Sequence, residues 1–249
     1  MQKTGIIIPC FNEEFRLKVE EFRNFRQHFN AVDFCFVNDG SSDNTGKMLA
    51  AFCAEAGEGF RVLDLPVNSG KAEAVRQGVL HIQQEGYAFI GYWDADLATP
   101  LSEIPRMLQI IEEARELKLY TLASRMKRLG AEVERSSTRH YLGRVFSTVA
   151  SIILKLPVYD SQCGAKIFRP VIIPYVFDKP FISRWLFDVE ILARLRNYLG
   201  IENTLRSTLE IPVGAWKEVG GSKIKLSYMI KVPFELLKIR SHYKRGGKA

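Results

Sequence analysis

Hydrophobic and polar positions follow a regular rhythm over the first half of the chain. Short apolar runs predict five strands, at residues 5–9, 33–37, 60–65, 87–93 and 120–124. Each run is followed by a segment with apolar residues at helical spacing, as in residues 13–29. Strands that alternate with such helices are typical of βαβ units. The pattern therefore predicts an α/β fold with a mostly parallel central sheet that is covered on both faces.

The second half of the chain departs from this rhythm. Its pattern predicts a helix over 137–156, a strand at 164–169, a helix over 188–199 and a strand at 204–213. We see no internal repeat, low-complexity block or linker. We therefore expect one domain over residues 1–222, followed by a basic, amphipathic C-terminal helical appendage over residues 223–249.

Composition narrows the class of protein. Of 249 residues, 47% are hydrophobic and 25% are charged, which is ordinary for a globular domain and excludes disordered, collagenous and disulfide-scaffold chains. The four cysteines form no CxxC pair, which favours reduced thiols in a cytosol-facing protein. The N-terminus lacks the pattern of a signal peptide, and no apolar stretch approaches the roughly 20 residues of a membrane span. We therefore expect a cytoplasmic protein that does not cross a membrane.

Charge is distributed unevenly along the chain. The net charge is +7, and residues 223–249 alone contain eight Lys/Arg and one Glu, whereas residues 1–222 contain 27 of each sign. A nucleic-acid binder more often spreads basic residues over the face of a domain, so we expect no nucleic-acid partner. Basic residues interleaved with apolar ones favour peripheral contact with the cytoplasmic face of a membrane. A solvated helix that packs on its own domain is the alternative.

Polar residues follow four of the predicted strands, at the edge where open parallel sheets bind ligands. They occupy residues 9–13, 38–41, 68–71 and 94–96. Asp94 and Asp96 are two positions apart on an extended segment, so both carboxylates can address one cation. Hard oxygen ligands suit Mg²⁺ or Mn²⁺, which would bridge two phosphate oxygens. A helix cap is the alternative for this pair, but no glycine-rich phosphate loop is present to replace a metal.

These segments resemble a known family. Residues 8–14, 37–43, 68–71 and 94–96 resemble the family 2 glycosyltransferases of the GT-A fold, a Rossmann-like fold that binds nucleotide sugars. Residues 160–166, 184–190 and 216–223 resemble the dolichyl-phosphate glucosyltransferase branch in particular. The resemblance extends over nearly the whole chain, and it implies a metal-dependent hexosyltransferase with an Asp-x-Asp motif at residues 94–96.

The resemblance also implies roles for individual residues at the donor site. The nucleotide would be bound by Pro9, Asn12, Glu13, Asp39, Lys71 and Asp94, with Asp39 on the nucleobase. Asp94 and Asp96 would flank the diphosphate and hold the metal. Two positions depart from the family pattern. Asn38 stands where many relatives have Asp, and Ala98 stands where the mannosyl branch has a metal-binding Gln, which favours the glucosyl branch.

A cluster of basic residues after the fifth predicted strand points to the acceptor. A phosphate monoester is largely ionised near pH 7, so as a nucleophile it needs arginines to hold it and no general base. Arg135 and Arg139 are spaced to share one helix face, and with Arg125 they resemble the lipid-phosphate-binding positions of polyprenyl-phosphate glycosyltransferases. A solvated basic helix face is the alternative.

Three more carboxylates, Asp160, Asp188 and Glu190, are candidates for a role at the acceptor. One of them would be the general base if the acceptor were a sugar hydroxyl. The resemblance favours inverting transfer of glucose from UDP-glucose to a polyprenyl (dolichyl-type) phosphate. Alternatives are another donor such as GDP-mannose, a glycan or glycolipid hydroxyl as acceptor, or a nucleotide-sugar-binding module without activity.

Overall fold

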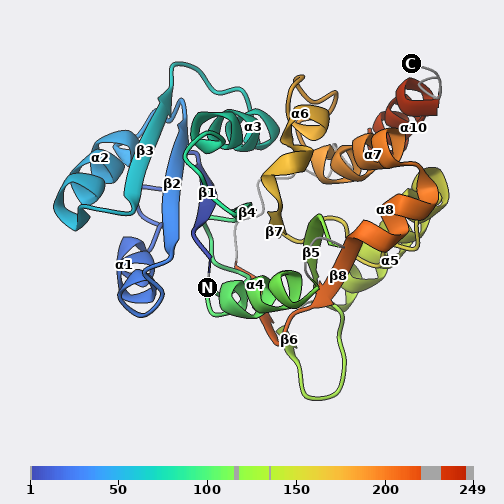
Figure 1. The fold of residues 1–249 in the computed structure, drawn as a ribbon, viewed down its shortest axis with the longest axis horizontal. Helices are drawn as coiled ribbons and strands as arrows, with labels where there is room; N and C mark the ends of the chain where they lie inside the picture. Colours follow the sequence, from blue (N-terminus) through green and yellow to red (C-terminus); the bar gives the residue numbers. More distant parts are fainter. Residues whose placement is uncertain (1, 115–117, 135, 220–230, 245–249) are drawn as a thin grey trace.

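A seven-stranded sheet forms the centre of the protein (Figure 1). The computed structural model describes residues 2–114, 118–134, 136–219 and 231–244. The strands lie in the order β3-β2-β1-β4-β7-β5-β8, and only β7 runs antiparallel to its neighbours. Their bounds are β1 (Thr4–Cys10), β2 (Val32–Asp39), β3 (Phe60–Leu65), β4 (Phe89–Trp93), β5 (Tyr120–Ser124), β7 (Ala165–Phe168) and β8 (Thr208–Pro212). The α/β fold with a mostly parallel sheet is confirmed.

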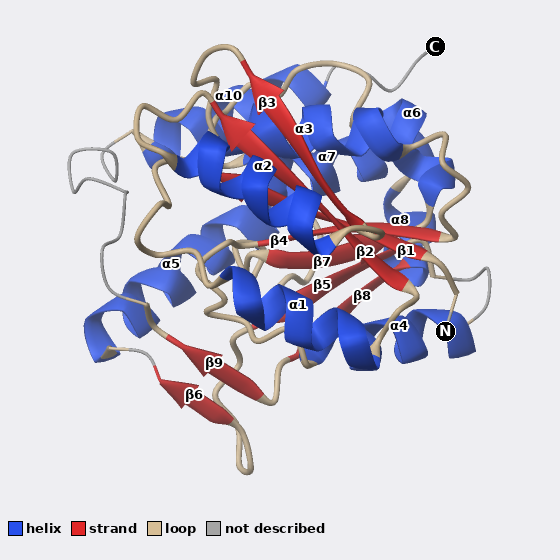
Figure 2. Ribbon diagram, turned by 90° about the vertical axis from the view of Figure 1, so that its left-hand side faces the viewer, coloured by secondary structure: helices blue, strands red, loops and turns tan. Residues whose placement is uncertain are grey.

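Helices cover both faces of this sheet (Figures 1 and 2). They are α1 (Val19–His28), α2 (Thr45–Ala56), α3 (Lys71–Ile82), α4 (Glu103–Glu113), α5 (Ser137–Leu154), α6 (Ile173–Val176), α7 (Phe187–Leu199), α8 (Ile201–Ser207) and α10 (Val232–Lys244). A 3₁₀ turn, η2 (Pro170–Ile172), precedes α6. A separate small sheet pairs β6 (Glu132–Glu134) with β9 (Ala215–Lys217). In Figure 2 this small sheet lies below α5 at the left of the molecule.

The alternation of side chains along the strands divides the core into two layers. In β1, Ile7 packs with α3, α5 and α7 on one face, whereas Ile6 and Ile8 pack with α1, α2 and α4 on the other. All three side chains are fully buried. Strands that are buried on both faces read as continuous apolar runs, because neither face meets water. This explains why continuous apolar runs predicted these strands.

Five elements differ from the expected pattern. The helix expected from residue 13 begins at Val19, because the segment before it is a loop tied to the β2–α2 connection by hydrogen bonds. The strand expected over 204–213 begins only at Thr208. Residues before it form α8, which follows Gly200 at a positive φ of 78°. The strands β6 and β9 are three residues each, too short to show a period.

The C-terminal segment contributes a helix to the fold. In α10, Leu236 and Ile239 are buried against α5 and α7, while Phe234 and Leu237 are exposed. Residues 220–230 and 245–249, where much of the expected basic appendage falls, lie outside the described residues. Among the helices that the structure describes, none is both long enough and apolar enough to cross a membrane.

Candidate active site

The ends of β1 and β2 are joined by hydrogen bonds between their loops. Asn12 has a φ of 50°, in the left-handed region that asparagine tolerates, and its Oδ1 accepts the N–H of Ser42 at 2.9 Å. The N–H of Glu13 donates to Thr45 Oγ1 at 2.8 Å. Pro9 lies within β1, opposite Val37 of β2. The residues expected to line the nucleotide pocket are therefore placed at one edge of the sheet, and their contacts with a nucleotide stay a prediction.

Asp39 holds the turn that precedes α3. Its carboxylate accepts the N–H groups of Ser69 and Gly70, both at 2.8 Å, and the side-chain amide of Asn68 at 3.1 Å. Burial raises the pKa of the Asp39 carboxyl, although the bonds from the two N–H groups oppose that shift. These three donors leave about one of its roughly four acceptor positions for a nucleobase. The expected contact with the base stays a prediction.

Lys71 and Asp94 bring the start of α3 to the end of β4. Lys71 Nζ forms an ion pair with Asp94 Oδ1, and the N–H of Asp94 donates to the carbonyl of Gly164 at 2.8 Å. A Cβ at Gly164 would lie 1.9 Å from Asp94 Oδ2, so only glycine leaves room for this carboxylate. Burial pulls the pKa of Lys71 down, but the charges of Asp94 and Asp188 outweigh it and the pKa lies above its ordinary value. Lys71 is therefore a fixed cation at this site.

Asp96 follows in the same loop, close enough to Asp94 for the two charges to interact. Its Oδ1 accepts the N–H of Ala98 at 3.0 Å, across Leu97 at a φ of 53°. Burial raises the pKa of Asp96, and the negative charge of Asp94 raises it further. A bound cation would relieve this repulsion, and two carboxylates are the hard donors that Mg²⁺ and Mn²⁺ prefer.

The donor set for such a metal is incomplete without a ligand. Among the residues that the structure describes, no three His, Cys, Asp or Glu side chains form a group that could hold a metal ion. Mg²⁺ is commonly bound by one or two carboxylates together with substrate phosphates and waters. Asp94 and Asp96 therefore fit a metal that arrives with a diphosphate, and metal binding by this pair stays a prediction.

Arg125 is engaged in an internal ion pair. Its guanidinium bonds the Asp160 carboxylate twice, Nε to Oδ2 at 2.6 Å and Nη2 to Oδ1 at 2.7 Å, and lies over the Trp216 ring. Against the effect of burial, Arg125 lowers the pKa of Asp160 to about 2. Arg135 lies outside the described residues, and so does the side chain of Arg139. Joint binding of a phosphate by these three arginines therefore stays a prediction.

The other two carboxylates considered as a general base, Asp188 and Glu190, are also buried. Asp188 is paired with the buried Lys166 and accepts the hydroxyl of Tyr92 at 2.5 Å. Glu190 accepts Arg194 Nη2 at 2.8 Å and the N–H of Ile182, also at 2.8 Å. With Asp160, these carboxylates are at most 5% exposed. Each is satisfied inside the protein and none faces solvent as a free base.

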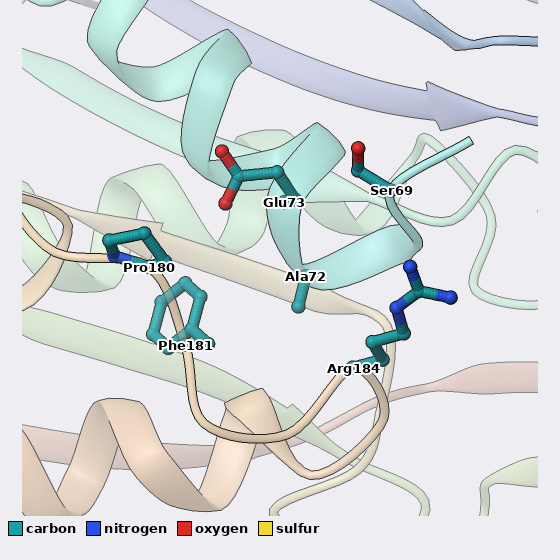
Figure 3. Close-up of a pocket in the computed structure, with 6 residues that line it drawn as sticks. All are labelled: Ser69, Ala72, Glu73, Pro180, Phe181 and Arg184. Carbon is teal, nitrogen blue, oxygen red and sulfur yellow. The ribbon is translucent and has the colours of Figure 1, made fainter. Parts of the chain in front are cut away.

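Arg184 lies beside the candidate site and was not singled out from the sequence. It lines a pocket beside the start of α3, together with Ser69, Ala72, Glu73, Pro180 and Phe181 (Figure 3). Its aliphatic stem packs so close to Gly70 that a Cβ there would lie 3.2 Å from Arg184 Cδ. Its positive charge lowers the pKa of Asp39, against the larger effect of burial. The signal for Arg184 was its place at the head of the 184–190 segment.

Comparison with known proteins identifies the family. Residues 5–173 match the family described as Glycosyl transferase family 2. The chain belongs to glycosyltransferase family 2. Among curated relatives of this glycosyltransferase, the dolichyl-phosphate beta-glucosyltransferase of Saccharomyces cerevisiae is 32% identical, over 97% of this chain and 75% of the relative. ALG5C of Trichomonas vaginalis, which bears the same name, is 29% identical, over 98% of this chain and 72% of the relative.

Solved structures confirm the GT-A-like fold of this glycosyltransferase. Glucosyl-3-phosphoglycerate synthase from Mycobacterium tuberculosis, in complex with UDP, superposes with a TM-score of 0.66 at 16% identity, over 96% of this chain and 80% of the other. Its complex with Mn²⁺, UDP and glucosyl-3-phosphoglycerate gives the same TM-score, over 97% of this chain and 80% of the other. Both the fold and the resemblance expected from the sequence are therefore confirmed.

Proposed function

We propose that this family 2 glycosyltransferase transfers glucose from UDP-glucose to a polyprenyl phosphate, with inversion at the anomeric carbon. One observation carries the choice of acceptor. The three carboxylates that could have served as a general base for a hydroxyl acceptor, Asp160, Asp188 and Glu190, are all paired and buried.

A hydroxyl acceptor must lose its proton to a base that reaches it. Asp160, with a pKa of about 2 and both oxygens on Arg125, is a poor base for that step. A phosphate acceptor carries its own negative charge near pH 7 and attacks without a base. The enclosed carboxylates thus favour a phosphate over a glycan or glycolipid hydroxyl.

The donor proposal rests on the edge of the sheet that holds Asp94, Asp96 and Lys71. Bound Mg²⁺ or Mn²⁺ would neutralise charge on the departing diphosphate. Lys71 keeps Asp94 in place and adds a positive charge where the diphosphate would lie. Similar solved proteins hold UDP and Mn²⁺, and the curated relatives are named for transfer of glucose to dolichyl phosphate.

Different arginines have different tasks in this proposal. Arg125 positions the loop that follows β5, because its own N–H also donates to Asp160, at 3.0 Å. Arg135 and Arg139 would then hold the acceptor phosphate, since guanidinium groups match phosphate oxygens in a bidentate way. The attacking phosphate oxygen displaces UDP from the opposite side of the sugar ring, which gives a β-linked product from an α-linked donor.

A panel of donors and acceptors tests the proposal. Purified protein with Mg²⁺ or Mn²⁺ is given UDP-glucose or GDP-mannose, with a short-chain prenyl phosphate or the matching prenyl alcohol. We expect UDP release and a glucosyl phosphoprenol only with UDP-glucose and the phosphate. Equal transfer to the alcohol or to a sugar hydroxyl would overturn the choice of acceptor, and nucleotide binding without UDP release would make the protein a binding module.

A further inference from the structure

The outward face of α5 is apolar. Five of its side chains are 39–70% exposed, namely Tyr141, Leu142, Val145, Val149 and Ile152. Between residues 141 and 154 the only charged residue is Arg144, and its guanidinium lies 3.7 Å from the centroid of the Tyr159 ring. Helices at the surface of a globular protein normally turn polar residues outward. This face therefore has the composition of a contact surface.

A second helix extends the exposed apolar area. α10 packs along α5 and α7, and its Phe234 and Leu237 are 71% and 53% exposed. Its buried residues, Leu236 and Ile239, are fixed in the core beneath them. Both helices lie on the right-hand side of the molecule in Figure 1. Scattered surface apolar residues are common, but a gathering on two packed helices marks an interaction site.

In the sequence, positive charge is concentrated in the two longer segments that contain these helices. Residues 135–159 contain four Lys/Arg and no acidic residue, and residues 223–249 contain eight Lys/Arg and one Glu. The rest of the chain contains 23 Lys/Arg and 27 Asp/Glu. The two segments thus carry a charge of +11, while the remainder carries −4. An apolar face within a strongly basic segment is complementary to an anionic surface with an apolar interior.

We propose that the outward faces of α5 and α10 form a membrane interface, which docks on the surface of an anionic lipid bilayer. Apolar side chains would enter the boundary between headgroups and acyl chains, and nearby Lys and Arg would be attracted to the anionic headgroups. A second copy of this chain fits poorly, because α5 and α10 together contain five Lys/Arg and one Glu, so two such faces would repel each other.

The position of α5 connects this interface with the proposed acceptor site. Arg144 of α5 stacks on Tyr159, and the next residue, Asp160, holds Arg125. Ser151 of α5 also donates to the carbonyl of Val158 at 2.7 Å. A bilayer on α5 would lie beside the loop that follows β5. The inference rests on the proposed function, because a polyprenyl phosphate resides in a membrane and an enzyme that uses it must reach that membrane. Vesicle binding, however, can be measured without glucosyl transfer.

Vesicle binding tests the interface directly. Purified protein is sedimented with vesicles of phosphatidylcholine, or of phosphatidylcholine mixed with phosphatidylglycerol. We expect binding to the mixed vesicles that weakens as salt rises. The double variant Val145→Glu, Ile152→Glu should bind at least about tenfold more weakly, because it removes two apolar side chains from the interface and adds two negative charges facing an anionic surface. Both positions are exposed, so the fold should be retained.

Val171→Glu is the matched control, since Val171 is 59% exposed in η2, next to α6. It should bind vesicles like the wild type. Equal binding by the double variant and this control would overturn the interface. So would a wild type that is dimeric in light scattering and becomes monomeric in the double variant, because a second copy would then cover the face. Transfer to a short, water-soluble prenyl phosphate should be the same in all three proteins. If the wild type bound vesicles but showed no transfer, the proposed function would fail and the interface would stand.

Discussion

At the scale of single residues, the acidic side chains of this protein divide into two kinds. Asp94 and Asp96 repel each other beside Lys71 at the edge of the sheet, which raises the pKa of Asp96 beyond the effect of burial. Asp160 is matched by an arginine, which lowers its pKa. A carboxylate that is left in a destabilising position by its neighbours is a candidate for function. One that is fully satisfied is a candidate for stability.

Asp96→Asn should separate activity from stability. The amide keeps an oxygen for the N–H of Ala98 but removes a charged ligand, so transfer should fall by about 100-fold or more. Because the folded-state pKa of Asp96 is raised, its ionised form opposes folding above that pKa. The variant should therefore melt at a higher temperature than the wild type at pH 7, and the difference should shrink as the pH falls. A variant of full activity would exclude the carboxylate from the mechanism.

Arg125→Ala should destabilise the fold by about 3–5 kcal/mol, because it leaves Asp160 charged and buried without a partner. The lowered pKa of Asp160 means that the pair contributes fully above the unfolded pKa of about 4, and that its contribution is lost as the pH falls towards 2. Urea unfolding measures the loss. Adding Asp160→Asn should restore part of the stability, whereas additive losses would show that the pair is not coupled.

At the scale of elements, the turn before α3 is held by β2. Asp39, the last residue of β2, accepts hydrogen bonds from residues 68–70, so one carboxylate aligns two adjacent connections. Lys71 follows directly and begins α3. The position of this lysine beside Asp94 therefore depends on Asp39, which orders the proposed donor site through the turn whether or not it contacts a nucleotide.

Asp39→Asn distinguishes the two tasks considered for this residue. If Asp39 only holds the turn, the variant should bind UDP and GDP about equally less well. If it also reads the nucleobase, the wild type should prefer UDP and the variant should lose that preference. Asn68→Ala is the control, because it removes one donor and leaves the carboxylate. Thermal protection by each nucleotide, measured for the three proteins, gives the ratio, and an unchanged preference for UDP would exclude base reading.

The sequence predicted these elements unevenly. The strands β3 and β5 coincide with their predicted bounds, because continuous apolar runs between polar loops leave little choice of boundary. The insertion of β7 between β4 and β5 was not predicted, since strand order depends on contacts between distant segments. For the same reason, the sequence predicted the candidate site residues that follow the strands but not the residues that they bond to. Nothing in the sequence around Arg125 indicates a bond to a residue 35 positions away.

At the scale of the whole molecule, the proposed donor site draws on the connections after β1, β2 and β4. A ligand that bridges these connections should stabilise the entire domain, because it binds only when they are assembled. Binding at a concentration about 100 times its Kd adds roughly 2.7 kcal/mol to the free energy of unfolding. For a chain of this size, that corresponds to a rise in melting temperature of about 5–10 °C.

UDP should therefore raise the melting temperature with Mg²⁺ or Mn²⁺ and far less with EDTA, if Asp94 and Asp96 hold a metal together with the diphosphate. Thermal melts with UDP, metal and chelator in all combinations measure this coupling. Metal alone should have a small effect, because within the described part of the chain no third His, Cys, Asp or Glu joins Asp94 and Asp96 to complete a metal site. The same rise in EDTA as in metal would remove the metal from donor binding.

The antiparallel strand β7 has a consequence for the order in which the sheet forms during synthesis. The strands β1 to β4 pair among themselves, but β5 pairs only with β7 and β8, which lie later in the chain. When the ribosome has made β5, that strand has no neighbour, and the outer edge of β4 is open. Both β5 and the free edge of β4 stay unpaired until β7, residues 165–168, is made. A nascent chain paused before that point exposes an unpaired apolar strand edge, which is a template for aggregation and a target for chaperones.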